Sequence, residues 1–291
     1  MEAQRYIPAT SVAQAAMRLP ATAHIGGIHL RVLNLRVAAG FYADIVGVKA
    51  PPGTGGEIVL TGHSEHGATV RLTETPDAPL RAKHSAGLFH IAFRYPDRRR
   101  LAAAMWRLVR AHYPIGGAAD HLVSEAVYLE DPDGNGVELS CDRPRDSWPR
   151  RDGAIEMATE PLDVDALMEE APEEAIEADG RLDIGHIHLQ VTDLARSGAF
   201  YHDVLGLDVT QNSYPGALFL SAGGYHHHLG LNTWSTRGGV PADGTRRGMI
   251  SFTIRLGDTA THTRLGSQLG APMQAPLVFQ DPDQIAMEIL P

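Results

Sequence analysis

The stretch GIHLRVLNLRVAAGFYADIVGVKA (Gly27–Ala50) decides the fold, because it returns later in the chain as HIHLQVTDLARSGAFYHDVLGLDV (His186–Val209). Each copy opens with alternating apolar residues, which is typical of a half-buried strand. Asn34 or Asp193 then supplies a helix N-cap oxygen, and a glycine ends the amphipathic segment that follows. Strand, helix and stop signal recur together, so the chain contains an internal repeat.

Two further segments begin like strands and continue like helices, one from His90 and the other from Ser251. Both close on the turn sequence Asp-Pro-Asp and a final strand, in which Glu138 and Glu288 occupy equivalent positions. The chain is therefore composed of four related units, each with one strand, one helix and several further strands. We call them units one to four in chain order.

The composition is that of a soluble globular protein: 291 residues, of which 43% are hydrophobic and 21% charged. The net charge of −10 disfavours a nucleic-acid partner, which needs clustered Lys and Arg. The single cysteine, Cys141, excludes an intrachain disulfide and suits a reducing compartment, and no apolar run is long enough to span a membrane. We expect a cytoplasmic protein without a membrane partner that forms a homo-oligomer.

These patterns divide the chain into four parts. We expect an N-terminal tail over residues 1–20, units one and two over 21–145, an acidic, proline-bearing connector over 146–183, and units three and four over 184–291. The connector predicts one short helix near Val164–Glu170.

Four such βαβββ units resemble the vicinal oxygen chelate superfamily, also called the glyoxalase/bleomycin-resistance/dioxygenase fold. The resemblance covers nearly the whole chain outside the tail and the connector. It implies an α+β fold, in which the four βαβββ modules form two cup-shaped mixed sheets with the helices on the outside. Within the superfamily, the sequence looks most like the two-domain extradiol dioxygenases of the catechol 2,3-dioxygenase kind.

Metal ligands in this superfamily come from the first and last strands of the units. The first-strand position holds Gly27, His90, His186 and Ser251. The last-strand position holds Arg71, Glu138, Gly230 and Glu288. Pairing units in chain order leaves each cup one histidine and one glutamate, whereas pairing unit two with unit three unites His90, His186 and Glu138. This facial set holds non-haem Fe(II), with Mn(II) as an alternative.

The resemblance therefore implies an inside-out arrangement, which the superfamily allows. Units two and three would share the metal-binding cup, and units one and four would form a metal-free one. Glu288 of unit four lacks two histidine companions, and we interpret it as structural.

The extradiol signature matches HLVSEAVYLEDPDGNGVE, from His121 through Tyr128 to Glu138. One position departs, because Ala119 stands where the family prefers glycine, asparagine or a β-branched residue. The resemblance implies that His121 and Tyr128 hydrogen-bond the substrate oxygen or a developing oxyanion. Unit four has neither the histidine nor the tyrosine and looks like a decayed copy.

Three consecutive histidines, His226, His227 and His228, precede an apolar strand. Extradiol enzymes carry an adjacent histidine pair at such a place, and one of the pair shuttles protons. The resemblance favours His227 as this catalytic residue. His226 and His228 remain open, since a one-residue slip of a strand exchanges its faces.

Other repeated residues keep alternative interpretations. His29 and His188 match across the repeat and could line the mouth of a cup, or His188 could replace His186 as a ligand. The repeated pairs Phe41–Tyr42 and Phe200–Tyr201 predict packing of a helix against the sheet.

The resemblance implies an extradiol, or meta-cleavage, ring-opening dioxygenase that acts on a small aromatic diol of the catechol type with Fe(II) and O₂. One alternative is a glyoxalase-like metal-dependent lyase or isomerase, which usually takes a fourth protein ligand that Gly230 cannot supply. The other is a metal-free antibiotic-binding protein of the same fold.

Overall fold

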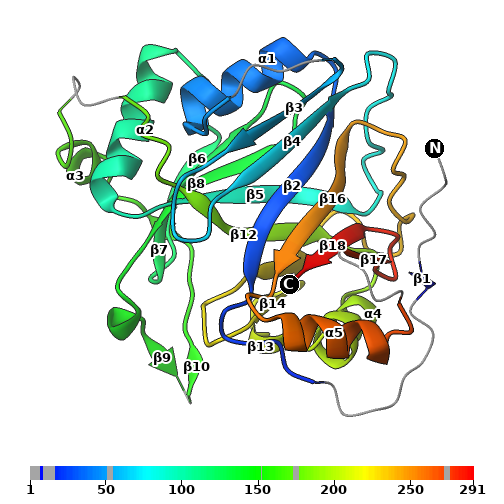
Figure 1. Cartoon of the computed structure of the whole chain (residues 1–291). Helices are drawn as coiled ribbons and strands as arrows, with labels where there is room; N and C mark the ends of the chain where they lie inside the picture. Colours follow the sequence, from blue (N-terminus) through cyan, green and yellow to red (C-terminus); the bar gives the residue numbers. More distant parts are fainter. Residues whose placement is uncertain (1–6, 9–16, 51–54, 152, 173–176, 272–275) are drawn as a thin grey trace.

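The computed structural model describes residues 7–8, 17–50, 55–151, 153–172, 177–271 and 276–291. Most of the predicted tail over residues 1–20 lies outside these ranges. The fold is α+β, with strands meeting in the middle of the molecule and helices on the outside (Figure 1).

The four repeated units are present, each with a strand, a helix and further strands in the predicted order; within the described residues three strands follow the helix in units two and three, and two follow it in units one and four. Unit one comprises β2 (His24–Val32), α1 (Leu35–Gly40), β3 (Glu57–Thr61) and β4 (Thr69–Glu74). Unit two comprises β5 (Gly87–Tyr95), α2 (Arg98–Arg110), β6 (Gly117–Asp120), β7 (Ser124–Glu130) and β8 (Gly136–Asp142). Unit three comprises β12 (Asp183–Gln190), α4 (Leu194–Ala199), β13 (Asp208–Gln211), β14 (Ala217–Ser221) and β15 (Leu229–Asn232). Unit four comprises β16 (Gly248–Arg255), α5 (Thr259–Gln268), β17 (Leu277–Gln280) and β18 (Ala286–Leu290).

The local signals act as predicted. The side chains of Asn34 and Asp193 cap the first helices of units one and three by accepting from backbone N–H groups one turn ahead. Gly47 has a φ of 98°, which is the left-handed conformation that ends the first helix. The sequence did not predict that the last turns of both helices, Phe41–Val46 and Phe200–Val204, are π-helical.

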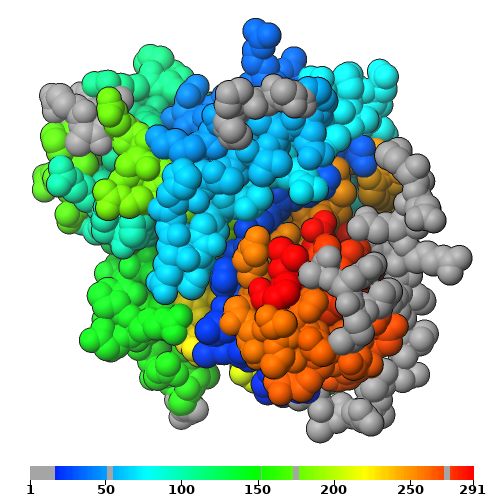
Figure 2. Space-filling view, in the orientation of Figure 1, coloured from blue at the N-terminus to red at the C-terminus, as the bar shows by residue number. Residues whose placement is uncertain are grey.

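The units pair inside out. Strand β5 of unit two lies antiparallel to β12 of unit three, and β16 of unit four lies antiparallel to β2 of unit one. Figure 2 shows units one and four, blue to cyan and orange to red, adjoining on one face. The two cups are also joined, because β12 and β2 pair at Ile184 and Ile25, so the main strands form one 16-stranded sheet.

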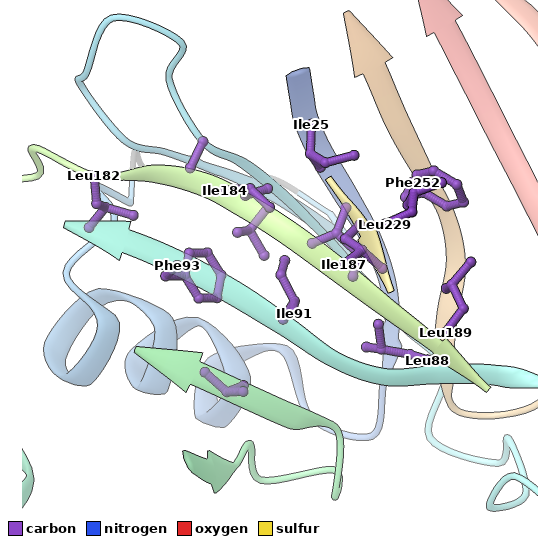
Figure 3. Packing of buried hydrophobic residues seen from close by; sticks show 14 of the residues in the cluster. Ile25, Leu88, Ile91, Phe93, Leu182, Ile184, Ile187, Leu189, Leu229 and Phe252 are labelled. Atoms are coloured by element: carbon purple, nitrogen blue, oxygen red, sulfur yellow. The ribbon is translucent and has the colours of Figure 1, made fainter. Parts of the chain in front are cut away.

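Alternation along the central strands separates the core from the site. Ile91 and Phe93 of β5 and Ile187 and Leu189 of β12 are buried in the hydrophobic core (Figure 3). The residues between them face the other side of the sheet, where the histidines lie.

Two tyrosine hydrogen bonds link units in chain order. Tyr42 donates to Asp131 at 2.9 Å and Tyr201 donates to Asp281 at 3.0 Å, and both aspartates open an Asp-Pro-Asp turn. The repeated tyrosines pack against the sheet, as predicted, and they also form hydrogen bonds that were not predicted. They anchor the turn that precedes the last strand of the next unit.

The connector forms several short elements. The predicted helix is present as α3 (Val164–Met168). It is preceded by β9 (Arg150–Arg151), β10 (Ala154–Ile155) and β11 (Glu160–Pro161), and β11 pairs with β6 of unit two. At the other end of the sheet, β1 (Ile7–Pro8) pairs with β17. Among the helices of the described ranges, none is long and apolar enough to cross a membrane.

Candidate metal centre

Three adjacent strands position the predicted ligands. Strand β5 lies between β12 and β8. In the register with β12, His90 is opposite His188 and Ala92 is opposite His186. In the register with β8, Ala92 is opposite Glu138. A bulge at Gly185 inserts one extra residue into β12 just before His186. It leaves Ile184 in the core while His186 faces the cavity, which is how bulges re-aim side chains beside functional sites.

The three side chains meet at a single point. Nε2 of His90 lies 3.2 Å from Nε2 of His186, and Oε2 of Glu138 lies 3.1 Å and 3.3 Å from these two nitrogens. All three residues are buried. Among the described residues, this is the one group of three or more His, Cys, Asp or Glu side chains with ligand atoms close enough to hold a metal ion.

The geometry fits a divalent first-row metal. Imidazole and carboxylate ligands bind such a metal at about 2.1 Å, so two ligands at right angles lie about 3 Å apart. The three measured separations agree with this value. In addition, Oε1 of Glu138 is buried and has no hydrogen-bond partner within the described part of the chain. His188 does not join the group, so the set is His90, His186 and Glu138.

Burial and the close imidazoles set the charges of the ligands. Burial opposes ionisation of Glu138, but His186 and His90 outweigh it and hold the pKa of this carboxyl well below its ordinary value. Burial lowers the pKa of His186. The carboxyl of Glu138 is therefore ionised, and burial favours the neutral form of His186, which is the form in which an imidazole binds a metal.

The signature residues lie beside this centre. The ring of Tyr128 is 5.7 Å from the ring of His90, and its hydroxyl is 2.5 Å from Nε2 of His121. Nδ1 of His121 is 2.7 Å from the carbonyl oxygen of Ala158. That carbonyl can only accept, so His121 donates through Nδ1 and, when neutral, accepts the phenolic proton of Tyr128 through Nε2.

The three consecutive histidines have three different surroundings. The ring of His227 lies 4.1 Å from that of His186 and lines the cavity. His226 is buried behind it, and His228 points elsewhere, with Nδ1 3.2 Å from the backbone N–H of Ala222. His227 is the member of the trio that faces the candidate metal centre.

A buried chain of contacts behind His227 was not predicted. Oδ1 of Asp142 is 3.1 Å from Nε2 of His226, and Nδ1 of His226 is 2.8 Å from Nδ1 of His227. Arg94 and Tyr225 also donate to Asp142. Burial opposes ionisation of Asp142, but His226 and Arg94 lower its pKa to about 2. The sequence offered no signal for this residue, because it lies at the end of another unit's last strand.

Aromatic residues surround the centre, and one of them depends on a second bulge. The register between β5 and β12 skips Phe89, which adds an extra residue next to His90. Alternation alone would send Phe89 to the core, but it lines the cavity and lies 5.4 Å from Trp234. His188, predicted as a possible mouth residue, also lines the cavity, 5.0 Å from His90.

The remaining candidates lie in the other cup. Glu288 accepts a hydrogen bond from Ser251 at 3.3 Å, and His29 contacts Thr73 at 2.8 Å. Neither residue lines the cavity.

The cavity around the centre measures about 1370 Å³. Its walls come mainly from units two and three, with residues 80–83 before β5 and Arg247 before β16, and from the connector, which contributes Met157, Ala158 and Thr159. The connector is thus part of the site as well as a link between units. A small aromatic molecule occupies only a fraction of such a space.

Comparisons with known proteins agree with this architecture. The profile of the Glyoxalase/Bleomycin resistance protein/Dioxygenase superfamily matches residues 22–139 and 183–289. A protein of Bacillus subtilis strain 168 named catechol-2,3-dioxygenase is 42% identical over 238 residues, which cover 80% of this chain and 82% of that protein.

Two solved structures share the fold. One is a proposed dioxygenase from Bacillus subtilis, with a TM-score of 0.62 and 14% identity over 94% of this chain and 86% of the other. The second is glyoxalase I from Zea mays, with a TM-score of 0.56 and 15% identity over 92% of each chain. At such identities the likeness concerns the fold alone.

Proposed function

The chain belongs to the Glyoxalase/Bleomycin resistance protein/Dioxygenase superfamily, and from this membership we propose that it is an extradiol ring-cleavage dioxygenase. It would open a catechol-type ring beside the two hydroxyls with O₂. The observation that carries the proposal is the buried cluster of His90, His186 and Glu138. The name of the 42% identical relative supports the same reaction class.

His90, His186 and Glu138 would hold Fe(II), and Mn(II) suits the same donors. When bound, the metal would supply open coordination positions, a Lewis acid for two vicinal oxygens and an electron conduit to O₂. The single carboxylate of the set leaves a divalent ion with residual positive charge, which favours a deprotonated diol as the ligand.

His227 would act as the general base. The carboxylate of Asp142 accepts from Nε2–H of His226, so Nδ1 of a neutral His226 must accept from Nδ1–H of His227. That tautomer leaves Nε2 of His227 unprotonated. We find no hydrogen-bond partner for this nitrogen among the described residues. It is placed to take a proton from the substrate hydroxyl and to return one when the ring opens.

Tyr128 would hold a second proton for the reaction. Its hydroxyl donates to His121 in the absence of substrate, and it can donate instead to a substrate oxygen that develops negative charge. Burial and the neighbouring Glu138 raise the pKa of Tyr128 well above its ordinary value. The phenol therefore keeps its proton at neutral pH and acts as a donor.

The aromatic walls would seat the ring and exclude water. Phe89 and Trp234 meet edge to face, and Phe219 lies 5.0 Å from the ring of His227. An apolar slot beside the ligands strengthens the electrostatic contacts inside it.

Two observations weigh against the alternatives. A glyoxalase-like lyase usually takes a fourth protein ligand, and the equivalent position is Gly230, which has no side chain. A metal-free binding protein would not need a buried carboxylate with one unpartnered oxygen beside two imidazoles.

The test is metal analysis of protein purified without air, followed by a panel of catechols. We expect stoichiometric iron or manganese, one O₂ consumed per catechol, and a yellow ring-fission product. Nickel or zinc with no oxygen uptake would favour the lyase, and protein that takes up no metal would favour the binding protein.

A further inference from the structure

One face of strand β12 connects the candidate metal centre to an arginine at the far end of the cavity. His186, His188 and Gln190 alternate along this strand and all line the cavity. Gln190 lies four residues from His186, a rise of roughly 13 Å. Its Oε1 accepts from Nη2 of Arg81 at 2.7 Å, and its Nε2 donates to Ser235 at 2.7 Å. Gln190 therefore holds the guanidinium in place.

Arg81 is held entirely by neutral groups. Besides Gln190, the guanidinium donates to the carbonyl oxygens of Ser85 at 2.8 Å and Leu88 at 3.0 Å. A guanidinium has more N–H donors than these three acceptors use. No carboxylate lies within ion-pair distance of Arg81 in the described part of the chain. It is half-buried, and burial lowers its pKa, but an arginine remains charged at neutral pH.

The backbone is shaped to admit this side chain. Gly87 has a φ of 149°, and a Cβ added there would lie 3.0 Å from Cδ of Arg81. The absence of a side chain at this position lets the arginine lie across the end of β5.

Two acidic side chains that line the same cavity, Asp131 and Asp133, have partners other than Arg81. Asp131 is bound by Tyr42 and by the backbone of its own turn. Asp133 accepts from the backbone N–H of Leu33 and lies 3.9 Å from Arg247. A half-buried cation without a counter-charge is costly unless something else supplies the charge.

A second polar group between Arg81 and the candidate metal centre lacks a partner. His188 is 4% exposed, and its Nε2 has no hydrogen-bond partner among the described residues. Buried imidazole nitrogens are nearly always paired. Two groups on one wall of the cavity, His188 and Arg81, are thus left for a ligand to satisfy.

The exposed apolar residues at the mouth indicate what the remainder of that ligand is. Leu80, Phe89 and Trp234 all line the cavity, and each is more than a third exposed. Exposed apolar side chains that gather at a cavity mouth are typical of a binding site.

We propose that the wall between His188 and Arg81 is a subsite for a carboxylate, and that the substrates are catechols whose ring bears an acidic side chain. The distance along β12 between His186 and Gln190 requires a short chain or a second ring between the diol and the carboxylate of the substrate. The inference rests on the proposed function, because it assumes that the diol binds at His90, His186 and Glu138.

The experiment measures binding without turnover. Metal-loaded protein is titrated without O₂, in a calorimeter, with 3-(3,4-dihydroxyphenyl)propanoate and with the corresponding neutral propanamide, which has the same shape. We expect the wild-type protein to bind the propanoate about tenfold more tightly or better, as for a charge-assisted contact. Arg81→Gln should abolish this preference.

The matched control is Arg237→Gln, which removes the same charge from an exposed arginine that does not line the cavity. The Arg237→Gln variant should keep the preference for the propanoate. If this variant loses the preference, the preference arises from the overall charge of the protein and not from a contact with Arg81. Equal binding of the two ligands by the wild-type protein overturns the subsite, as does a preference that survives in Arg81→Gln. If Arg81→Gln does not fold, Arg81→Lys must weaken the preference, because an ammonium lacks the planar fork.

Ring cleavage is then measured with the same two compounds. Cleavage of both compounds at equal kcat/KM without a binding preference contradicts the subsite and leaves the dioxygenase proposal standing. An Arg81-dependent binding preference without cleavage of any catechol supports the subsite and contradicts the dioxygenase proposal.

Discussion

The imidazole of His188 occupies the space that a side chain at Gly230 would need. The two residues are opposite each other on the parallel strands β12 and β15, and a Cβ added to Gly230 would lie 2.9 Å from Cγ and Cδ2 of the His188 ring. Position 230 in unit three is equivalent to position 138 in unit two, which holds Glu138. The ring from the neighbouring strand thus fills the space that a fourth ligand side chain would need, and the proposed ligand set has three members.

Gly230→Ala should therefore destabilise the protein by about 1–3 kcal/mol, because an inserted methyl group must displace a packed ring. In a His188→Ala background the same change should cost much less. Urea denaturation of the two single variants and the double variant gives the coupling free energy. Strict additivity of the two costs would contradict the contact.

Glu138→Ala and His186→Ala should each lose the metal while retaining the fold. Removing one of three ligands leaves two, too few to hold the ion against water. Metal content after anaerobic purification and gel filtration measures the effect, and far-UV circular dichroism checks folding. Glu288→Ala, at the equivalent strand position of unit four, is the matched control and should keep full metal content. Metal retained by both ligand variants would refute the assigned set.

His227→Gln should keep the metal and bind catechol, but kcat should fall by about 10²-fold, as for a lost general acid–base group. Stopped-flow measurement of ring-fission product gives kcat directly. The neighbouring His228→Gln serves as the control, since His228 contacts Ser221 and Ala222 and faces away from the cavity. A large loss in His228→Gln with none in His227→Gln would reassign the proton shuttle.

Asp142 should make stability depend on acid pH. Its folded pKa of about 2 lies below the unfolded value of 3.8, so its contribution is present above about pH 4 and is lost as the pH falls toward 2. The difference corresponds to about 2 kcal/mol. Asp142→Asn should lower the free energy of unfolding at pH 6 and flatten its decline between pH 4 and pH 2. If the free energy of unfolding falls equally with pH in the variant and the wild type, the pKa of Asp142 is not lowered in the folded protein.

The sequence predicted the four repeated units because its signals are local and repeated, and the cup-shaped fold followed from the resemblance that these units carry. A strand pattern, an N-cap such as Asn34 and a stop such as Gly47 each act within one turn or one strand. Four repeats of the same order then restrict the architecture to related units. Histidines at equivalent repeat positions, together with Glu138, also predicted the inside-out pairing of units two and three, which the register of β5 with β12 bears out.

Tertiary structure decided what depends on contacts between distant segments. The bulges at Gly185 and Phe89 arise from the fit of two strands nearly a hundred residues apart, so alternation in one strand could not place Phe89 in the cavity. Asp142 reaches His226, and Gln190 reaches Arg81, only after the sheet has formed. A sequence pattern specifies which face a residue belongs to, whereas the partner on that face depends on register, and register is settled by packing of the whole sheet.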